Sequence, residues 1–233
     1  MKKLREFLSE HRHFYLLLLL LPILVWFKYL EFTIVPKYYT EIAFDRKIPF
    51  LPIFVVPYVF WFVFVAYGIL YVGIYSKQDF YRLLFFLGGG MIVANILYSV
   101  FPNAQGLRPI VSSNDPFSLL VKFIYATDTP TDVFPSIHVI NAIAVDAALR
   151  HSEEFSKKRL GKAVSFSLTV LICFSTVFIK QHAILDVASG AAVAVLLYVP
   201  LYILPARRFA AKFGTARGLS RRIDDLRNNS GNE

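Results

Sequence analysis

The stretch LPIFVVPYVFWFVFVAYGILYVGIYS, which runs from Leu51 to Ser76, contains no charged residue. About 20 consecutive apolar residues are enough to cross the hydrocarbon core of a bilayer as a helix. The whole chain shares this character, because 56% of its 233 residues are hydrophobic and its mean hydropathy is +0.53. A soluble domain of this size does not need so many apolar side chains. The sequence therefore predicts an integral membrane protein.

Six apolar runs predict an all-α, polytopic membrane protein whose six transmembrane helices form a compact bundle. The expected spans are 14–30, 53–75, 83–101, 133–149, 163–179 and 183–204. The first run follows a basic start, but no small-residue cleavage site comes after it, so we expect a retained helix and not a signal peptide. The predicted organisation is a basic N-terminus over 1–13, a membrane domain over 14–204 and a basic tail over 205–233.

The basic residues predict the orientation of the chain. Of the 25 Lys and Arg residues, 18 fall in the alternate segments 1–13, 76–82, 150–162 and 205–233. Cytoplasmic segments carry the excess of positive charge, so both termini are expected on the cytoplasmic side of the membrane. The net charge of +9 is then mainly a topological signal. A nucleic-acid partner is not expected, because the basic residues flank the spans and do not form one folded basic surface.

Three polar clusters lie at the ends of expected spans, where polar groups are costly in lipid and are candidates for function. They are Phe101–Pro109 after the third span, Pro135–His138 at the start of the fourth, and Lys180–Asp186 between the fifth and sixth. The predicted topology places all three clusters at the outer face. We therefore expect them to converge on one extracytoplasmic site.

The residue types in these clusters suit phosphoryl transfer. His182 and Asp186 are spaced i, i+4, so a helix places them on one face, where the carboxylate can orient the imidazole. Ser136 and His138 stand at an expected helix start, where free N–H groups and the helix dipole favour an anion. Two imidazoles can supply a nucleophile and an acid, while nearby cations hold the phosphate oxygens.

Arg108 and Lys180 supply the cations. A two-histidine, one-carboxylate metal site made of His138, His182 and Asp186 is an alternative. The two adjacent cations would repel a metal ion, so we expect a site with neither metal nor cofactor. Lys180 is ambiguous, because a lysine at a span end can also simply extend toward the aqueous interface.

The quoted residues also resemble a known family. Arg108-Pro109, Pro135-Ser-Ile-His138 and His182-x-x-x-Asp186 are similar to the three signature motifs of the type-2 phosphatidic acid phosphatase superfamily, the lipid phosphate phosphatases related to vanadium haloperoxidases. The likeness covers about residues 80–200. It implies that His182 attacks phosphorus, that Asp186 orients it and that His138 protonates the leaving group. It also implies that Arg108 and the Ser136 hydroxyl hold the phosphate.

The chain departs from that family pattern at three positions. Phe101 stands where the family usually has a lysine, Ile137 replaces a glycine, and Ser175-Thr176 stands where Ser-Arg is usual. Lys180 is the nearest cation that could replace the missing arginine. The motifs are also similar to membrane phosphotransferases related to inositol phosphorylceramide synthases, which have Phe-Pro-Ser-x-His and lack this arginine.

Three functions follow from these features. The first is a metal-independent phosphatase that hydrolyses a phospholipid or polyprenyl phosphate at the outer leaflet. The second is a phosphotransferase that passes the phosphoryl-bearing headgroup to a lipid alcohol. The third is a non-catalytic lipid-binding or transport protein, although His138, His182 and Asp186 are all retained. The expected partners are a lipid phosphate and the bilayer, and the sequence indicates neither the lipid nor an oligomeric state.

Overall fold

The computed structural model describes residues 10–204 of the chain. Most of the predicted basic N-terminus and the whole predicted tail at 205–233 lie outside the described residues. The chain divides into two units, Met1–Leu197 and Tyr198–Glu233. The described part of the second unit is a short π-helical stretch.

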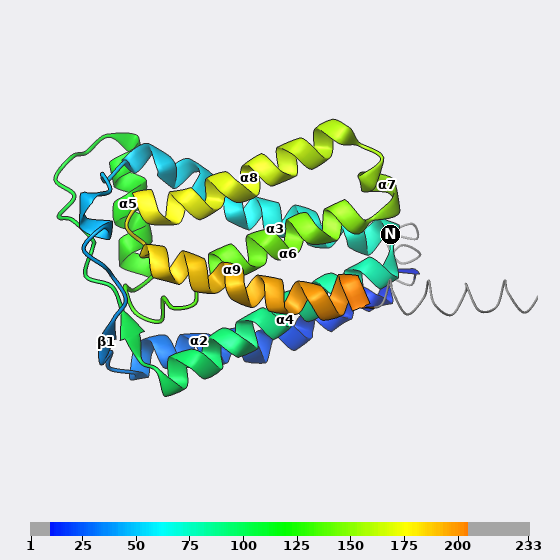
Figure 1. Ribbon diagram of the computed structural model, residues 1–233, viewed down its shortest axis with the longest axis horizontal. Coiled ribbons are helices and arrows are strands. Elements are labelled where there is room, and N and C mark those ends of the chain that lie inside the picture. The colour runs from blue at the N-terminus through cyan, green and yellow to red at the C-terminus, as the bar shows by residue number, and fades with distance from the viewer. Residues whose placement is uncertain (1–9, 205–233) are drawn as a thin grey trace, which may run out of the picture. The chain divides into compact units, whose positions relative to one another are not determined.

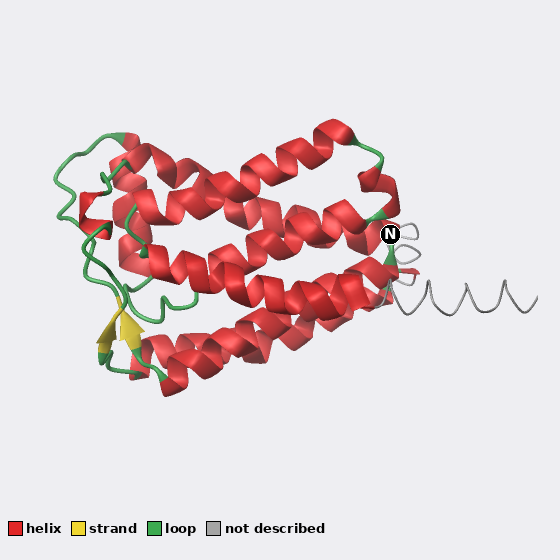
Figure 2. Ribbon diagram, viewed as in Figure 1, coloured by secondary structure: helices red, strands yellow, loops and turns green. Residues whose placement is uncertain are grey.

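Helices make up almost all of the regular structure, and the two strands have two residues each (Figure 2). In chain order the elements are η1 (Arg12–Leu19), α2 (Leu20–Thr33), β1 (Tyr38–Tyr39), η2 (Asp45–Lys47), η3 (Pro52–Phe54), α3 (Val55–Tyr75), α4 (Lys77–Val100), β2 (Asn103–Ala104), α5 (Pro116–Thr127), α6 (Ile137–His151), α7 (Glu153–Ser156), α8 (Arg159–Phe178), α9 (Ile184–Tyr198) and η4 (Val199–Ile203).

Five helical segments among residues 10–204 are long and apolar enough to cross a membrane. They are Arg12–Thr33, Pro52–Tyr75, Lys77–Val100, Arg159–Phe178 and Ile184–Ile203. The prediction of an all-α, polytopic membrane protein is confirmed. The remaining expected span corresponds to α6, which has 15 residues and so extends about 22 Å, less than the ~30 Å hydrocarbon core. The count of six spans stays a prediction.

Helix α6 is the central helix of the first unit, and it packs against α3, α4 and α8. Small residues allow this close approach. At Gly90 of α4, a Cβ atom would lie 2.5 Å from the Ile140 side chain. At Gly190 of α9, a Cβ atom would lie 2.8 Å from the Ser136 carbonyl oxygen. Glycine at these two positions therefore lets α4 and α9 close around the start of α6.

Helix α5 was not expected from the sequence, and it crosses one end of the bundle (Figure 1). Asp115 caps it by accepting hydrogen bonds from the N–H groups of Phe117 and Ser118, at 3.0 and 3.1 Å. Pro116 occupies the first helical position, where no N–H partner is needed. Val121 and Ile124 of α5 belong to a buried cluster that also contains residues of α3 and the α8–α9 connection. This packing closes the end of the bundle at which the three polar clusters gather.

Candidate active site

The first polar cluster holds the other two in place through side-chain hydrogen bonds to their backbones. The Asn103 Oδ1 accepts hydrogen bonds from the N–H groups of Val133 and Phe134, at 2.9 and 2.8 Å, just before the second cluster. The Gln105 Nε2 donates to the Lys180 carbonyl at 2.8 Å in the third cluster. Both side chains are almost fully buried. The three clusters, distant in sequence, thus form one structural unit, as the topology predicted.

The start of α6 is fixed by a helix cap. The Ser136 Oγ accepts a hydrogen bond from the Val139 N–H at 3.4 Å, and the Ser136 N–H donates to the Asp186 carbonyl at 3.0 Å. Ser136 is fully buried. Its predicted role as a phosphate ligand is not tested by these contacts, but its hydroxyl already serves the helix cap.

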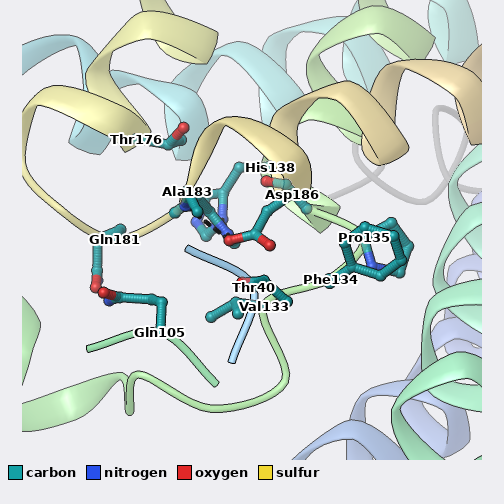
Figure 3. Close-up of polar contacts among 12 residues, drawn as sticks. Thr40, Gln105, Val133, Phe134, Pro135, His138, Thr176, Gln181, Ala183 and Asp186 are labelled. Atoms are coloured by element: carbon teal, nitrogen blue, oxygen red, sulfur yellow. Dashed lines mark hydrogen bonds and ion pairs between the residues drawn. The ribbon is translucent and has the colours of Figure 1, made fainter. Parts of the chain in front are cut away.

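Two histidines from separate clusters contact each other at this helix start. The His138 Nδ1 lies 3.3 Å from the His182 Nε2, so one ring donates a hydrogen bond and the other accepts it. On the far side of His182, its Nδ1 lies 3.6 Å from the Asp186 Oδ2. Asp186 is fully buried, and the same oxygen accepts a hydrogen bond from the Ala183 N–H at 2.7 Å (Figure 3). In the row His138–His182–Asp186, the Asp186 carboxylate therefore faces one nitrogen of the His182 ring, and His138 contacts the other nitrogen.

Aromatic side chains of α3 hold the His138 ring. The ring centroids of Tyr58 and Trp61 lie 4.8 and 4.7 Å from that of His138. The Trp61 Nε1 also donates to the His138 carbonyl at 3.1 Å. This contact could not be predicted from the sequence, because aromatic residues are common in membrane spans and these two look like ordinary lipid-facing positions.

Arg108 reaches the third cluster through Gln181. The Arg108 Nη2 donates to the Gln181 Oε1, and the guanidinium lies 4.4 Å from the centroid of the Tyr125 ring. The Gln181 Nε2 donates in turn to the Asp128 Oδ2 at 3.2 Å, and the Tyr58 hydroxyl donates to the same oxygen at 3.2 Å. Burial lowers the pKa of Arg108, and Asp128 opposes this shift. Burial raises the pKa of Asp128, while His182 and Arg108 pull it down.

Lys180 does not point toward the histidine pair. Its Nζ donates to the carbonyl oxygens of Asp45 and Ile48, at 2.8 and 2.7 Å, and it is 5% exposed. Burial lowers the pKa of this ammonium group, and Asp45 opposes the shift. Thr176, at the position of the missing arginine, donates its hydroxyl to the Cys173 carbonyl of its own helix. In this arrangement Lys180 holds the turn at 45–48.

A small cavity of about 30 Å³ adjoins the histidine pair. Its lining includes His138, His182, Gln181, Asp128 and Asp132. This volume is enough for about one water molecule. Neither carboxylate oxygen of Asp132 has a hydrogen-bond partner among the described residues. Burial, and then the charge of Glu31, raise the pKa of Asp132 to about 6.

The fold and the site define a polytopic helical membrane protein with two histidines and a carboxylate in a row at one end of its bundle. The family model described as PAP2 superfamily matches residues 83–210, so the chain belongs to that superfamily. The resemblance seen in the motifs is confirmed by this match.

A relative from Arabidopsis thaliana, named lipid phosphate phosphatase delta, is 29% identical over 133 residues. The alignment covers 51% of this chain and 32% of the relative, so the chain spans about a third of that protein's length. No solved structure matches the chain.

Proposed function

We propose that this protein is an integral membrane lipid phosphatase that acts on a phospholipid or polyprenyl phosphate through a phosphohistidine. The observation that carries the proposal is the row formed by His138, His182 and Asp186, with its 3.3 and 3.6 Å separations. Membership in the PAP2 superfamily and the name of the Arabidopsis relative support the same activity.

In the first half-reaction the His182 Nε2 attacks phosphorus, and the bond from phosphorus to the lipid oxygen breaks. His138 gives its proton to that oxygen, which leaves as a lipid alcohol. Asp186 faces the His182 Nδ1, so it stabilises the positive charge that develops on the imidazole. The two rings are in direct contact, so they must separate when the phosphoryl group enters between them.

Positive charge for the phosphate oxygens would come from Arg108 and from the N-terminus of α6. Arg108 is already aimed at the third cluster through Gln181, which is the residue before His182. The guanidinium can exchange the amide oxygen of Gln181 for a phosphate oxygen, a stronger charged acceptor. This arrangement needs no metal ion. Within residues 10–204 no three His, Cys, Asp or Glu side chains form a group that could hold one.

The second half-reaction decides between hydrolysis and transfer. With His138 now acting as base, water attacks the phosphohistidine and releases phosphate, which restores His182. A lipid alcohol in the place of water would instead yield a new phosphorylated lipid. Thr176 stands where the family usually has an arginine, and the related phosphotransferases also lack that arginine. This shared difference favours transfer as the second candidate.

We place the active site at the extracytoplasmic face, with both termini in the cytoplasm. The support is that 18 of the 25 Lys and Arg residues fall in the segments 1–13, 76–82, 150–162 and 205–233. In Figure 1, the α3–α4 connection and α7 lie at the end of the bundle opposite to α5. The three polar clusters gather at the α5 end.

The test is to trap the intermediate. Purified protein is mixed with a ³²P-labelled lipid phosphate and quenched in alkali, in which phosphohistidine is stable. We expect labelled protein in the wild type and none in His182→Ala, whose turnover should fall about 100-fold or more. His138→Ala should lose a similar factor because it lacks the acid. Near-normal turnover in either variant would refute the assignment, and labelled lipid in place of free phosphate would identify a transferase.

A further inference from the structure

A second, larger pocket continues from the active site into the bundle. It has a volume of about 400 Å³ and is bounded by α2, α3, α4, α5 and α6. His138 and Asp128 line both this pocket and the small cavity at the histidine pair. Most of the other lining side chains are apolar. A ligand whose phosphate lies at the histidines can therefore extend a hydrocarbon chain into this pocket.

The pocket is also open to the side of the bundle. Leu24 of α2 and Phe62 of α3 line it and are 44% and 56% exposed. Both residues lie in helices that are long and apolar enough to cross a membrane. A lipid chain can thus enter between α2 and α3 from the bilayer without passing through water.

Besides His138 and Asp128, the pocket wall contains the polar side chains of Lys28, Thr127 and Asn141. Asn141 lies one turn after His138 on α6, on the same helix face, with Cβ atoms about 5–6 Å apart at this spacing. It lines the pocket and is 5% exposed. Its Oδ1 is buried and has no hydrogen-bond partner in the described part of the chain. A buried acceptor without a donor is costly, so the site is built for a donor that arrives with the ligand.

We infer that this pocket holds the hydrocarbon chain of the lipid and that Asn141 selects a lipid with an O–H or N–H donor a few atoms from its phosphate. An amide-linked or hydroxylated lipid meets this requirement, and a lipid with only ester or ether groups there does not. The inference rests on the proposed function for the position of the phosphate. Binding to the pocket can nevertheless be measured without turnover.

Trp61 supplies the signal for that measurement, because it lines the pocket. The chain has two tryptophans, so Trp26→Phe leaves Trp61 as the only one. Two alkyl phosphonates, brominated on the chain and differing only in a hydroxyl near the phosphonate, are titrated in detergent. We expect saturable quenching of Trp61 that the unbrominated phosphonate reverses. The hydroxylated ligand should bind about tenfold more tightly.

The discriminating variant is Asn141→Leu, which keeps the side-chain volume and removes the acceptor. We expect it to lose the tenfold preference while its thermal midpoint stays the same or rises. Met91→Leu, in the same pocket, should change both affinities together and keep their ratio. A preference that survives in Asn141→Leu, or no saturable quenching by either ligand, would overturn the inference.

The same titration separates this inference from the proposed function. In His182→Ala the preference for the hydroxylated ligand should persist although turnover is lost. If the wild type binds with the preference but turns over no lipid phosphate, the proposed function fails and the pocket assignment stands. If turnover proceeds and Asn141→Leu has the selectivity of the wild type, the pocket assignment fails and the function stands.

Discussion

Replacement of Lys180 by methionine distinguishes a structural lysine from a phosphate ligand. The ammonium group donates to the carbonyl oxygens of Asp45 and Ile48 and is almost fully buried. The same turn is bound to the start of α9, because the Asp45 Oδ1 accepts a hydrogen bond from the Ile184 N–H at 2.9 Å. Methionine keeps the length of the side chain and removes the donors.

The expected loss can be worked from these contacts. A hydrogen bond from a charged donor contributes about 1.5–3 kcal/mol, and two are removed. Burial lowers the pKa of Lys180, which means that burying the charged form is itself costly. Methionine avoids that cost, which offsets part of the loss. We therefore expect the free energy of unfolding to fall by about 2–3 kcal/mol.

The assay pairs stability with kinetics. Thermal unfolding of the purified protein in detergent should show a lower midpoint for Lys180→Met, while KM for a lipid phosphate changes less than about threefold at a permissive temperature. Lys122→Met is a matched control, because Lys122 is at the same end of the bundle and donates to the exposed Asn114 side chain. An unchanged midpoint with a KM raised tenfold or more would refute the structural role. Thr176→Arg should then restore part of the affinity.

Four further outcomes are expected. Asp186→Asn should lower turnover about 100-fold or more, because a neutral amide no longer stabilises the charged form of His182. Activity should survive an excess of chelator, and vanadate should inhibit as a mimic of the transition state; loss with chelator and recovery with Zn²⁺ would indicate a metal site. Burial raises the pKa of Asp132 to about 6 in the folded protein, whereas an aspartate in the unfolded chain has a pKa near 4. The free energy of unfolding should therefore fall by up to about 2 kcal/mol as the pH rises from 4 to 6. Asp132→Asn should flatten this pH dependence. In a cysteine-free background, Ser112→Cys should react with an impermeant thiol reagent in intact cells, and Glu154→Cys only after permeabilisation.

The sequence predicted those features that depend on composition and local spacing. Long apolar runs such as Leu51 to Ser76 predict spanning helices, because a bilayer imposes both the length and the hydrophobicity of such a helix. The i, i+4 spacing of His182 and Asp186 predicted a shared helix face. Helix α9 begins only at Ile184, so His182 lies in the connection before it, yet the two side chains come within 3.6 Å. Helix α5 was missed, although Asp115-Pro116 is a recognisable helix start. Its 12 residues are too short for a search based on membrane spans.

The contacts that could not be predicted are those in which a side chain binds a distant backbone. Asn103 and Gln105 lie in the first polar cluster, and they hold the loops of the other two clusters. Lys180 looked like a replacement cation, but it holds the turn before α3. Which polar side chain binds a loop and which binds a ligand depends on where the loops lie, and local sequence does not encode this.

These contacts divide the polar residues of the site into two groups with different consequences. Asn103, Gln105 and Lys180 are committed to backbone groups, so they fix the loops and leave little charge for a substrate. Arg108 also donates to a backbone group, the Tyr125 carbonyl at 3.3 Å, but its other partner is the neutral side chain of Gln181, which a phosphate oxygen can displace. In the proposed function, the site would therefore depend on preorganised histidines and on Arg108 as a movable cation. A lipid substrate would then gain much of its binding free energy from its chain, for which the largely apolar pocket beside His138 offers room.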